Sequence, residues 1–407
     1  MKKILFLAAF CLTAVCLEAQ NCGCTDPRAA NYNPQATLND GSCTYPATSI
    51  TTIYSTDLSS TLNGSSGIIN WNGELYTHND HSDRTLYRID TADGRITDLV
   101  RLADIAHKDI EDIDHDSLYI YLGDFGNNSS GNRRDLHIVR IEKSTLRSAR
   151  PHIDTIWFSY ADQTDFTATA GNGTDFDCEA FIVSDSIYLF TKQWISKKSR
   201  IYVLPKTPGT HAARFISEHN VGGLITSATY NAEKQHVVLT GYNSLLQPFL
   251  VLLYDYRGND FFSGNKRKIS ISKPFHQIEA IAGCDDYKFY LTNEYISKSI
   301  VTVNAGFHKI DLTQYLCPAE PVDIRIEKEP SGLKLYPNPA KDKLFINGAV
   351  CSSARYEIWN GIGKCVMKGR LVSNAITLAQ NNLPTGTYVI KIFNEGRMFV
   401  NHFQVIK

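Results

Sequence analysis

Short apolar runs separated by turn residues characterise the chain from residue 50 to residue 317. The runs are rich in Val, Ile, Tyr and Phe, and Gly, Asn or Asp interrupts them. This spacing predicts β-strands rather than helices. Five segments repeat one pattern: a strand, a turn, a second strand ending in polar residues, a hairpin and a third strand. The segments begin at Ser66, Glu111, Glu179, Ser227 and Glu279.

Further strand-like stretches lie between these segments, at 96–102, 155–160, 214–219 and 268–272. Each is a candidate fourth strand. The fifth segment lacks one, but a β-branched run at 49–54 precedes the first segment. A closed ring has this arrangement, because the N-terminal strand completes the last blade and no sheet edge stays exposed. We therefore predict an all-β fold, a β-propeller of five four-stranded blades. A sixth blade hidden in the longer second repeat is the alternative.

The first strand of each propeller blade faces the central channel, so the repeat predicts which polar side chains meet there. Glu111, Glu179 and Glu279 occupy one equivalent position, and Ser66 and Ser227 occupy it in the other two blades. The ends of the second strands add polar side chains beside them. The further channel or ligand candidates are Asp80, Asp124, Asn243 and Asn293.

Converging carboxylates repel one another unless they are protonated, paired with a cation or bridged by water. A bound calcium ion would resolve the conflict. The layout is similar to that of calcium-binding propellers of the gluconolactonase and regucalcin type. Two other interpretations stay open: each Glu caps backbone N–H groups or binds water, or a metal there is catalytic. By contrast, Asp114-His115-Asp116 has metal-ligand spacing but falls in a turn, where we expect exposure.

The C-terminal segment predicts a second β domain. From Leu333 it reads LKLYPNPAKDKLFING, and it closes with LPTGTYVIKIFNEGRMFVNHFQVIK. Short strands separated by turns indicate an immunoglobulin-like β-sandwich over 331–407. Cys351 and Cys365 flank one strand pair and are a candidate bridge.

Two separated blocks of this segment carry a resemblance. The residues are Tyr336, Pro337, Asn338, Pro339, Gly386 and Tyr388. In order, they resemble the C-terminal sorting domain of the type IX secretion system of Bacteroidetes. The resemblance implies that the type IX machinery is a partner and that the protein reaches the cell surface or is released. The middle region contains the motif EDI…GDFGNN…R.DL, through which it also resembles uncharacterised secreted propeller proteins of Bacteroidetes.

The N-terminus is consistent with export. Lys2 and Lys3 precede an apolar run at 4–15, and a small residue precedes Gln20, so 1–19 reads as a Sec signal peptide. A lipoprotein signal ending at Cys16 is the rival interpretation. No later stretch approaches the ~18 apolar residues of a membrane helix, so we expect no membrane span in the mature chain. The net charge of −1 offers no basic face for nucleic acid.

Residues 20–46 form a small cysteine-bracketed module that resembles the GCTDP…NYNP…DGSC module of secreted bacterial proteins. Cys24 and Cys43 bracket it, and a disulfide is expected because so small a core needs a covalent link. Cys22 is left over, with Cys317 as one candidate partner. The module also offers hard oxygen donors for a calcium site, although Asn and Asp equally form turns. These donors are Asp26, Asn31, Asn33 and Asp40.

The predicted organisation is a signal peptide (1–19), the small module (20–46), the propeller (47–317), a linker (318–330) and the sorting domain (331–407). No GxSxG, HExxH, Walker A or GxGxxG motif is present. We therefore expect an exported binding protein whose extracellular ligand, a carbohydrate, protein or small molecule, is unknown. The alternative is a metal-dependent hydrolase or lactonase with acid–base groups from Glu111, Glu179 and Glu279. A structural role in adhesion is the third hypothesis.

Overall fold

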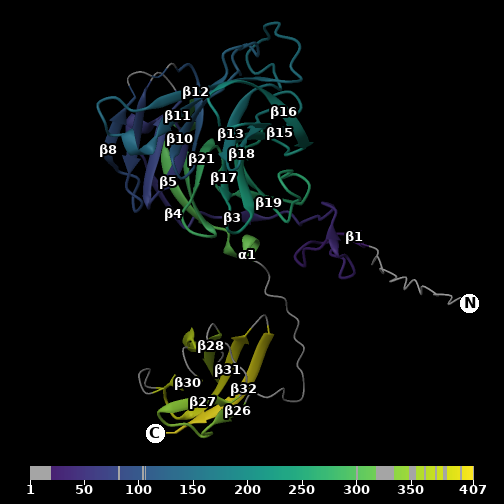
Figure 1. Cartoon of the computed structure of the whole chain (residues 1–407), viewed down its shortest axis with the longest axis vertical. Helices are drawn as coiled ribbons and strands as arrows, with labels where there is room; N and C mark the ends of the chain where they lie inside the picture. Colours follow the sequence, from purple (N-terminus) through teal and green to yellow (C-terminus); the bar gives the residue numbers. More distant parts are fainter. Residues whose placement is uncertain are drawn as a thin grey trace, which may run out of the picture. The chain divides into compact units, whose positions relative to one another are not determined.

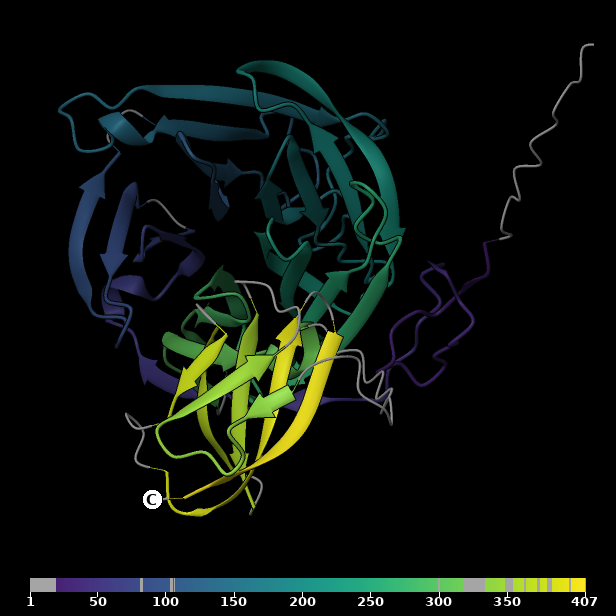
Figure 2. The same ribbon diagram turned by 60° about the horizontal axis from the view of Figure 1, so that its bottom comes forward.

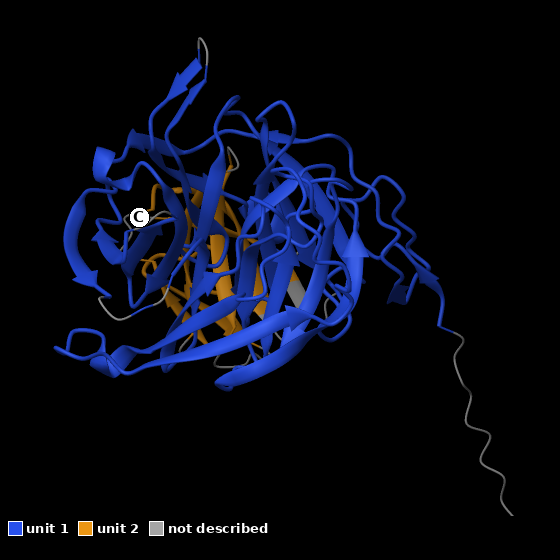
Figure 3. Ribbon diagram, turned by 90° about the horizontal axis from the view of Figure 1, so that it is seen from above, with its two compact units in different colours: residues 1–320 blue, residues 321–407 orange. Residues whose placement is uncertain are grey.

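The computed structural model describes residues 20–80, 83–102, 105, 107–298, 301–317, 334–347, 354–361, 364–371, 374–378, 383–394 and 397–406. The predicted signal peptide, the predicted linker and Cys351 lie outside these residues. The chain divides into two compact units, Met1–Glu320 and Pro321–Lys407 (Figures 1 and 3). The finer boundaries at 20–46, 47–317 and 331–407 stay predictions.

The first unit contains five four-stranded blades. Blade 1 is β5 (Ser65–Trp71), β6 (Glu74–Asn79), β7 (Thr85–Ile89) and β8 (Ile96–Arg101). Blade 2 is β9 (Ile110–His115), β10 (Tyr119–Asp124), β11 (His137–Glu142) and β12 (Ile153–Tyr160). Blade 3 is β13 (Cys178–Val183), β14 (Ile187–Thr191), β15 (Ser199–Leu204) and β16 (Gly209–His219). Blade 4 is β17 (Leu224–Asn231), β18 (His236–Tyr242), β19 (Pro248–Tyr254) and β20 (Asn265–Ile271). Blade 5 is β21 (Ile278–Gly283), β22 (Lys288–Asn293), β25 (Gly306–Asp311) and β4 (Tyr54–Asp57).

The blades form a closed ring around a common axis (Figure 2). The inner strands β5, β9, β13, β17 and β21 contact one another in that order, and β21 contacts β5. The N-terminal strand β4 pairs with β25 and completes blade 5, as predicted. The predicted closing run at 49–54 is nevertheless divided, because β3 (Ser49–Ile50) pairs in parallel with β20 of blade 4. The described residues form no sixth blade between the first and the fifth.

Apolar side chains fill the space between neighbouring blades. Every residue of β13 and β14 is buried, and these strands carry the β-branched and aromatic residues that suit a sheet covered on both faces. Phe125 and Phe181 meet edge to face between blades 2 and 3, with ring centroids 5.5 Å apart. A parallel pairing of β12 with β16 also joins the outer edges of these two blades. The ring is therefore stabilised by packing between blades as well as by hydrogen bonds within them.

Each inner strand contains a register shift near its beginning, and one residue is left unpaired there. The unpaired residues are Ser66, Glu111, Glu179, Thr226 and Glu279. A β-bulge of this kind redirects a side chain out of the regular alternation of a strand. In blade 4 the predicted equivalent, Ser227, is wrong by one residue, because Ser227 pairs with Thr240 and the bulge lies at Thr226.

The small module belongs to the first unit. Its two short strands, β1 (Cys22–Gly23) and β2 (Leu38–Asn39), pair in parallel. Outside the blades, β23 (Ile296–Lys298) pairs with β24 (Val301–Val303), and α1 (Thr313–Leu316) follows blade 5. No helix in the described part of the chain is long and apolar enough to cross a membrane.

The second unit is a β-sandwich, as predicted. One sheet has the order β26 (Lys334–Tyr336), β27 (Lys343–Asn347) and β30 (Ala375–Thr377). The other has the order β29 (Cys365–Arg370), β28 (Arg355–Asn360), β31 (Gly386–Asn394) and β32 (Arg397–Val405). Leu344, Ile358 and Ile390 are fully buried between the two sheets.

Candidate functional site

The bulges bring Glu111, Glu179 and Glu279 together at the end of the channel where the inner strands begin. Their exposed fractions are 7%, 4% and 7%. Burial raises the pKa of Glu111, and the negative charge of Glu179 adds to this shift; burial likewise raises the pKa of Glu179, and the charge of Glu279 adds to it. The three side chains that the repeat predicted to converge therefore do lie within electrostatic range. We call this end of the channel, with Lys192, the glutamate mouth.

Lys192 supplies a positive charge at the glutamate mouth. It follows β14, its side chain is buried, and its Nζ forms an ion pair with Glu179 Oε2. The same Nζ lies 5.0 Å from the ring centroid of Trp194 and 5.2 Å from that of Tyr242. Both rings can therefore contribute cation–π attraction. The sequence analysis did not identify Lys192.

Burial controls the proton affinities at this mouth. It raises the pKa of Glu279 to about 8, against the opposing charge of Lys192 and with the support of Glu294 and Asp80. Burial also raises the pKa values of Glu111 and Glu179 well above their usual range. Burial alone would lower the pKa of Lys192, but the surrounding carboxylates, Glu179 above all, raise it. Lys192 and the raised pKa values of the three glutamates thus reduce the repulsion between their carboxyl groups. This is the repulsion that led us to predict a calcium ion.

A metal ion at this mouth stays a prediction. Among the described residues, no group of three or more His, Cys, Asp or Glu side chains is arranged to hold one.

Two other predicted channel residues, Asp124 and Asn293, serve local structure. Asp124 is fully buried and accepts from Lys108 N (2.5 Å) and from Arg133 Nη2 (2.6 Å). Asn293 Oδ1 lies 2.7 Å from His308 Nε2, and its amide donates to Asn304 O. These contacts anchor the loops that follow β10 and β22.

Asp80 and Asn243 complete the set. Asp80 contributes to the raised pKa of Glu279, so it lies near the glutamate mouth. Asn243 Oδ1 accepts from Leu245 N (2.9 Å) and Gln247 N (3.0 Å), which shapes the β18–β19 turn.

A buried carboxylate closes the axis next to this mouth. Asp112 accepts from Ser227 Oγ (3.0 Å) and from Phe181 N (3.2 Å). Ser227 Oγ in turn accepts from Ile281 N (3.3 Å). Because Asp112 and Ser227 belong to blades 2 and 4, which are not neighbours, their hydrogen bond crosses the axis. Asp112 thus connects the inner strands of four blades through two side chains.

Beyond this closure lies a cavity of about 560 Å³, which we call the axial cavity. It opens at the end of the channel where the inner strands finish. All five inner strands line it, through Ile68, Ile113, Val183, Ala228 and Ile281. Its polar lining consists mainly of Asn70, Asp114, His115, Tyr230, Glu233 and Asp285. The sequence analysis did not identify this cavity.

Asp114 and His115 were expected to be exposed, and this expectation is wrong, because both are partly buried in the cavity wall. Asp114 accepts from Val183 N (2.6 Å) and from His115 N (2.7 Å). Burial raises the pKa of Asp114 to about 6, while His115 and Lys143 oppose the shift. His115 Nδ1 lies 2.9 Å from Lys143 Nζ, and its Nε2 lies 3.0 Å from Asn70 O.

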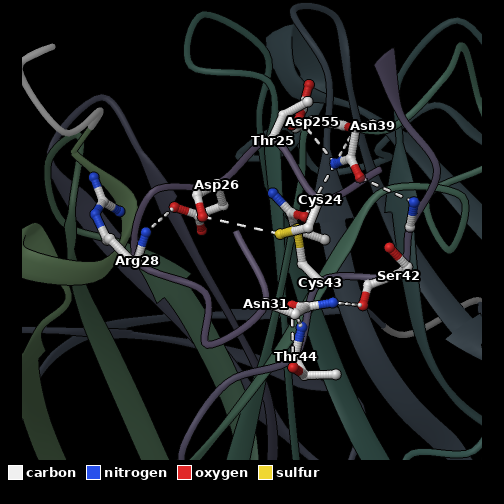
Figure 4. Close-up of a disulfide and its surroundings, with 12 residues drawn as sticks. Cys24, Thr25, Asp26, Arg28, Asn31, Asn39, Ser42, Cys43, Thr44 and Asp255 are labelled. Carbon is white, nitrogen blue, oxygen red and sulfur yellow. Dashed lines mark hydrogen bonds between the residues drawn. A yellow bond between two sulfur atoms is a disulfide. The ribbon is translucent and has the colours of Figure 1, made fainter. Parts of the chain in front are cut away.

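Figure 4 shows the predicted disulfide of the small module, Cys24–Cys43. The four proposed calcium ligands accept hydrogen bonds within the module. Asp26 accepts from Arg28 N, Asn31 from Thr44 N, Asn33 from Gln35 N and Asp40 from Ser42 N. The contacts of Asp26, Asn33 and Asp40 are the turn contacts of the alternative interpretation, whereas Asn31 joins two separate segments of the module. A calcium site here stays a prediction.

The module also docks on blade 4. Asn39 Nδ2 donates to Asp255 Oδ2 (2.8 Å) and Asn265 Oδ1 (3.0 Å). Tyr254 donates its hydroxyl hydrogen to Asp26 Oδ2 (2.6 Å). These hydrogen bonds attach the module to β19, β20 and the turn between them.

Two proposed cysteine pairings do not form in the structure. Cys22 and Cys317 are both free thiols. Cys365 is also free, and its sulfur contacts Met367 O at 3.6 Å. Cys365, the one partner of the predicted Cys351–Cys365 bridge that the structure describes, therefore forms no disulfide.

In the second unit, the two motif blocks meet at the last strand. Ala340 N donates to Gln404 O (2.7 Å), and Asn338 Oδ1 accepts from Gln404 N (2.8 Å). Gly386 begins β31 and pairs with Val405. Tyr336 is half exposed. The segment with Pro337 and Pro339 therefore lies along β32.

Residues 334–407 match the family model of the secretion system C-terminal sorting domain. This match supports the predicted export by the type IX system and a location outside the cell. It covers the second unit and assigns no role to the propeller. No curated protein matches the chain.

Several solved structures resemble the chain weakly. PorZ, a surface component of the type IX secretion system of Porphyromonas gingivalis, is 12% identical over 84% of this chain, with a TM-score of 0.31. The chain spans 45% of the PorZ chain. Glutaminyl cyclase of Myxococcus xanthus is 10% identical over 66% of this chain and 99% of its own, with a TM-score of 0.40. A protein of unknown function from Dyadobacter fermentans is 9% identical over 64% of this chain and 98% of its own, with a TM-score of 0.36.

Proposed function

We propose that this protein is type IX cargo whose propeller binds an extracellular ligand in the axial cavity. The sorting domain at 334–407 supports the export part of the proposal. The observation that carries the binding part is the lining of the axial cavity by all five inner strands. Its volume of about 560 Å³ falls within the usual range for small-molecule sites, roughly 300–1,000 Å³.

Binding is favoured over metal-dependent hydrolysis because of Lys192. The hydrolase hypothesis assigned Glu111, Glu179 and Glu279 to a metal ion and a water molecule. Lys192 Nζ instead occupies a position against Glu179 and affects the pKa of all three glutamates. Lys192 therefore supplies the positive charge for which a metal ion was proposed.

Gly283 allows a direct test of the binding proposal. It lies in the cavity wall, and a Cβ at this position would meet no atom within 4 Å. Gly283→Trp should therefore fill the cavity without a backbone clash. Gly171→Trp is the matched control, because Gly171 is exposed, does not line the axial cavity, and its Cβ would meet only Ser129 O at 3.8 Å.

The measurement is thermal unfolding of the mature protein against a panel of saccharides, peptides and small amines, acids and alcohols. Compounds that raise the Tm of the wild type and of Gly171→Trp should leave Gly283→Trp unchanged. Compounds that stabilise all three proteins equally would place binding elsewhere and overturn the proposal.

Export is tested in a host that has the type IX system. The full chain should reach the cell surface or the medium, and a chain lacking residues 334–407 should stay in the periplasm. Appearance of the truncated chain outside the cell would contradict the proposed route.

A further inference from the structure

We propose that the axial cavity binds a small organic cation with an apolar body, an inference that rests on the binding role proposed above. Three features of the cavity lead to this ligand class: its floor, its charge and the closure beneath it.

The floor of the cavity is apolar. Ile68, Ile113, Ala228 and Ile281 come from four different inner strands and line the floor at the axis, where packing between blades leaves each of them at most 4% exposed. Tyr230, which is partly exposed, adds an aromatic residue to the wall. Aliphatic or aromatic groups placed against the floor and wall leave water, which favours binding. A purely polar ligand would not use this surface.

The charged side chains in the wall are acidic. Asp114, Glu233 and Asp285 line the cavity, and none of the described lining residues is Lys or Arg. The carboxylate of Asp285 already pairs with Lys288 Nζ (3.0 Å). Asp114 accepts hydrogen bonds only from backbone N–H groups, and Lys143, which contacts His115, acts on it through its charge alone. Asp114 is therefore the negative charge that a bound ammonium group would neutralise most effectively.

The floor also limits the length of the ligand. Asp112 and Ser227 close the axis beneath Ile113 and Ala228, their neighbours in the chain. The glutamate mouth on the far side holds the ammonium group of Lys192 already. The ligand is therefore expected to end in the cavity rather than to thread the propeller.

The test uses three probes with one ring and different charge: 2-phenylethylamine, 2-phenylethanol and phenylacetate. Isothermal titration of the mature protein at pH 7.5 should show binding of the amine, at least tenfold weaker binding of the alcohol and no binding of phenylacetate. Asp114→Asn should weaken amine binding at least tenfold and leave alcohol binding unchanged.

Two further variants keep this test informative. Glu233 is exposed, so Glu233→Gln should preserve folding and reduce amine affinity by a smaller factor. Glu218→Gln is the matched control, because Glu218 lies on β16 at the outer edge of blade 3 and pairs with Lys198 and Arg200. Its amine affinity should equal that of the wild type.

The outcomes separate the two proposals. Equal binding of the amine and phenylacetate, or amine binding insensitive to Asp114→Asn and Glu233→Gln, would overturn the cationic ligand class. Binding of other panel compounds, lost in Gly283→Trp, with no binding of the amine, would overturn the ligand class and leave the binding role standing. Failure of every compound to show dependence on Gly283 would overturn both.

Discussion

Lys192 and Glu179 form a buried ion pair at the mouth of the propeller channel. Their side chains are 4% and 5% exposed. Glu179 reaches the axis through a bulge in β13, and Lys192 follows the neighbouring strand β14. Blade 3 therefore carries both partners, while blades 2 and 5 contribute the carboxylates Glu111 and Glu279. The charge of Lys192 and the raised pKa values of Glu111 and Glu279 together offset the repulsion among the three carboxyl groups.

Removal of Lys192 should destabilise the propeller strongly. Lys192→Met leaves the Glu179 carboxylate buried without its partner, and such a change typically costs about 3–5 kcal/mol. Urea unfolding of the mature protein at pH 7 measures the loss. Lys192→Met combined with Glu179→Gln should recover part of it, because the uncompensated charge is then absent. Unchanged stability of Lys192→Met would show that the pair does not hold the mouth together.

Glu279 should make stability depend on pH. Its pKa is about 8 in the folded protein, and about 4.3 is usual for an unfolded chain. The folded state therefore binds more protons than the unfolded state between these values, and stability falls as pH rises from 5 to 8. One proton corresponds to a slope of at most about 1.4 kcal/mol per pH unit.

The variant that tests this slope is Glu279→Gln. Urea unfolding between pH 5 and 8.5 should show a smaller decrease in stability than in the wild type, and the variant should be the more stable protein at pH 8. Parallel curves for the two proteins would contradict the assignment.

The disulfide should matter for the small module and less for the ring. The Cys24–Cys43 bridge closes a loop with a sequence separation of 19, for which loop entropy predicts roughly 3 kcal/mol. In Cys24→Ser/Cys43→Ser, hydrogen exchange should speed up across 20–46 and stay slow in the inner strands. Rapid exchange throughout the blades would instead show that the docked module is needed for the propeller.

Amine binding in the axial cavity should weaken in acid. Burial raises the pKa of Asp114 to about 6, so the carboxylate becomes neutral as pH falls from 7.5 to 5. His115, Lys143 and Asp112 are the titratable or charged groups around it. Titrations of 2-phenylethylamine should show the decrease in the wild type and in His115→Gln but not in Asp114→Asn. A decrease of the same size in Asp114→Asn would assign it to another group.

The sequence predicted the ring well because its pattern is repeated. Glu111, Glu179 and Glu279 each follow an apolar residue at the start of an inner strand, so three blades align without ambiguity. The bulge position predicted for blade 4 was wrong by one residue, because Thr226 and Ser227 are chemically alike and either suits the repeat. The closing strand was predicted too early in the sequence, because the run 49–54 is strongly β-branched. Only Tyr54 of that run belongs to β4.

The site was harder to predict than the fold, since charge balance depends on three-dimensional neighbours. Nothing in the run containing Lys192 and Gln193 indicates which side chain turns towards the axis. The axial cavity could not be predicted either, because Ile68, Ala228 and Ile281 look like ordinary core residues in sequence. Their role depends on the gap that ring closure leaves between them.

The most direct test of the binding account is a crystal structure of the mature protein with 2-phenylethylamine. The account predicts density for the ring at the cavity floor beside Tyr230 and for the ammonium group within hydrogen-bond distance of Asp114. Ligand density at the glutamate mouth or on the outer surface, with the axial cavity holding only water, would contradict it.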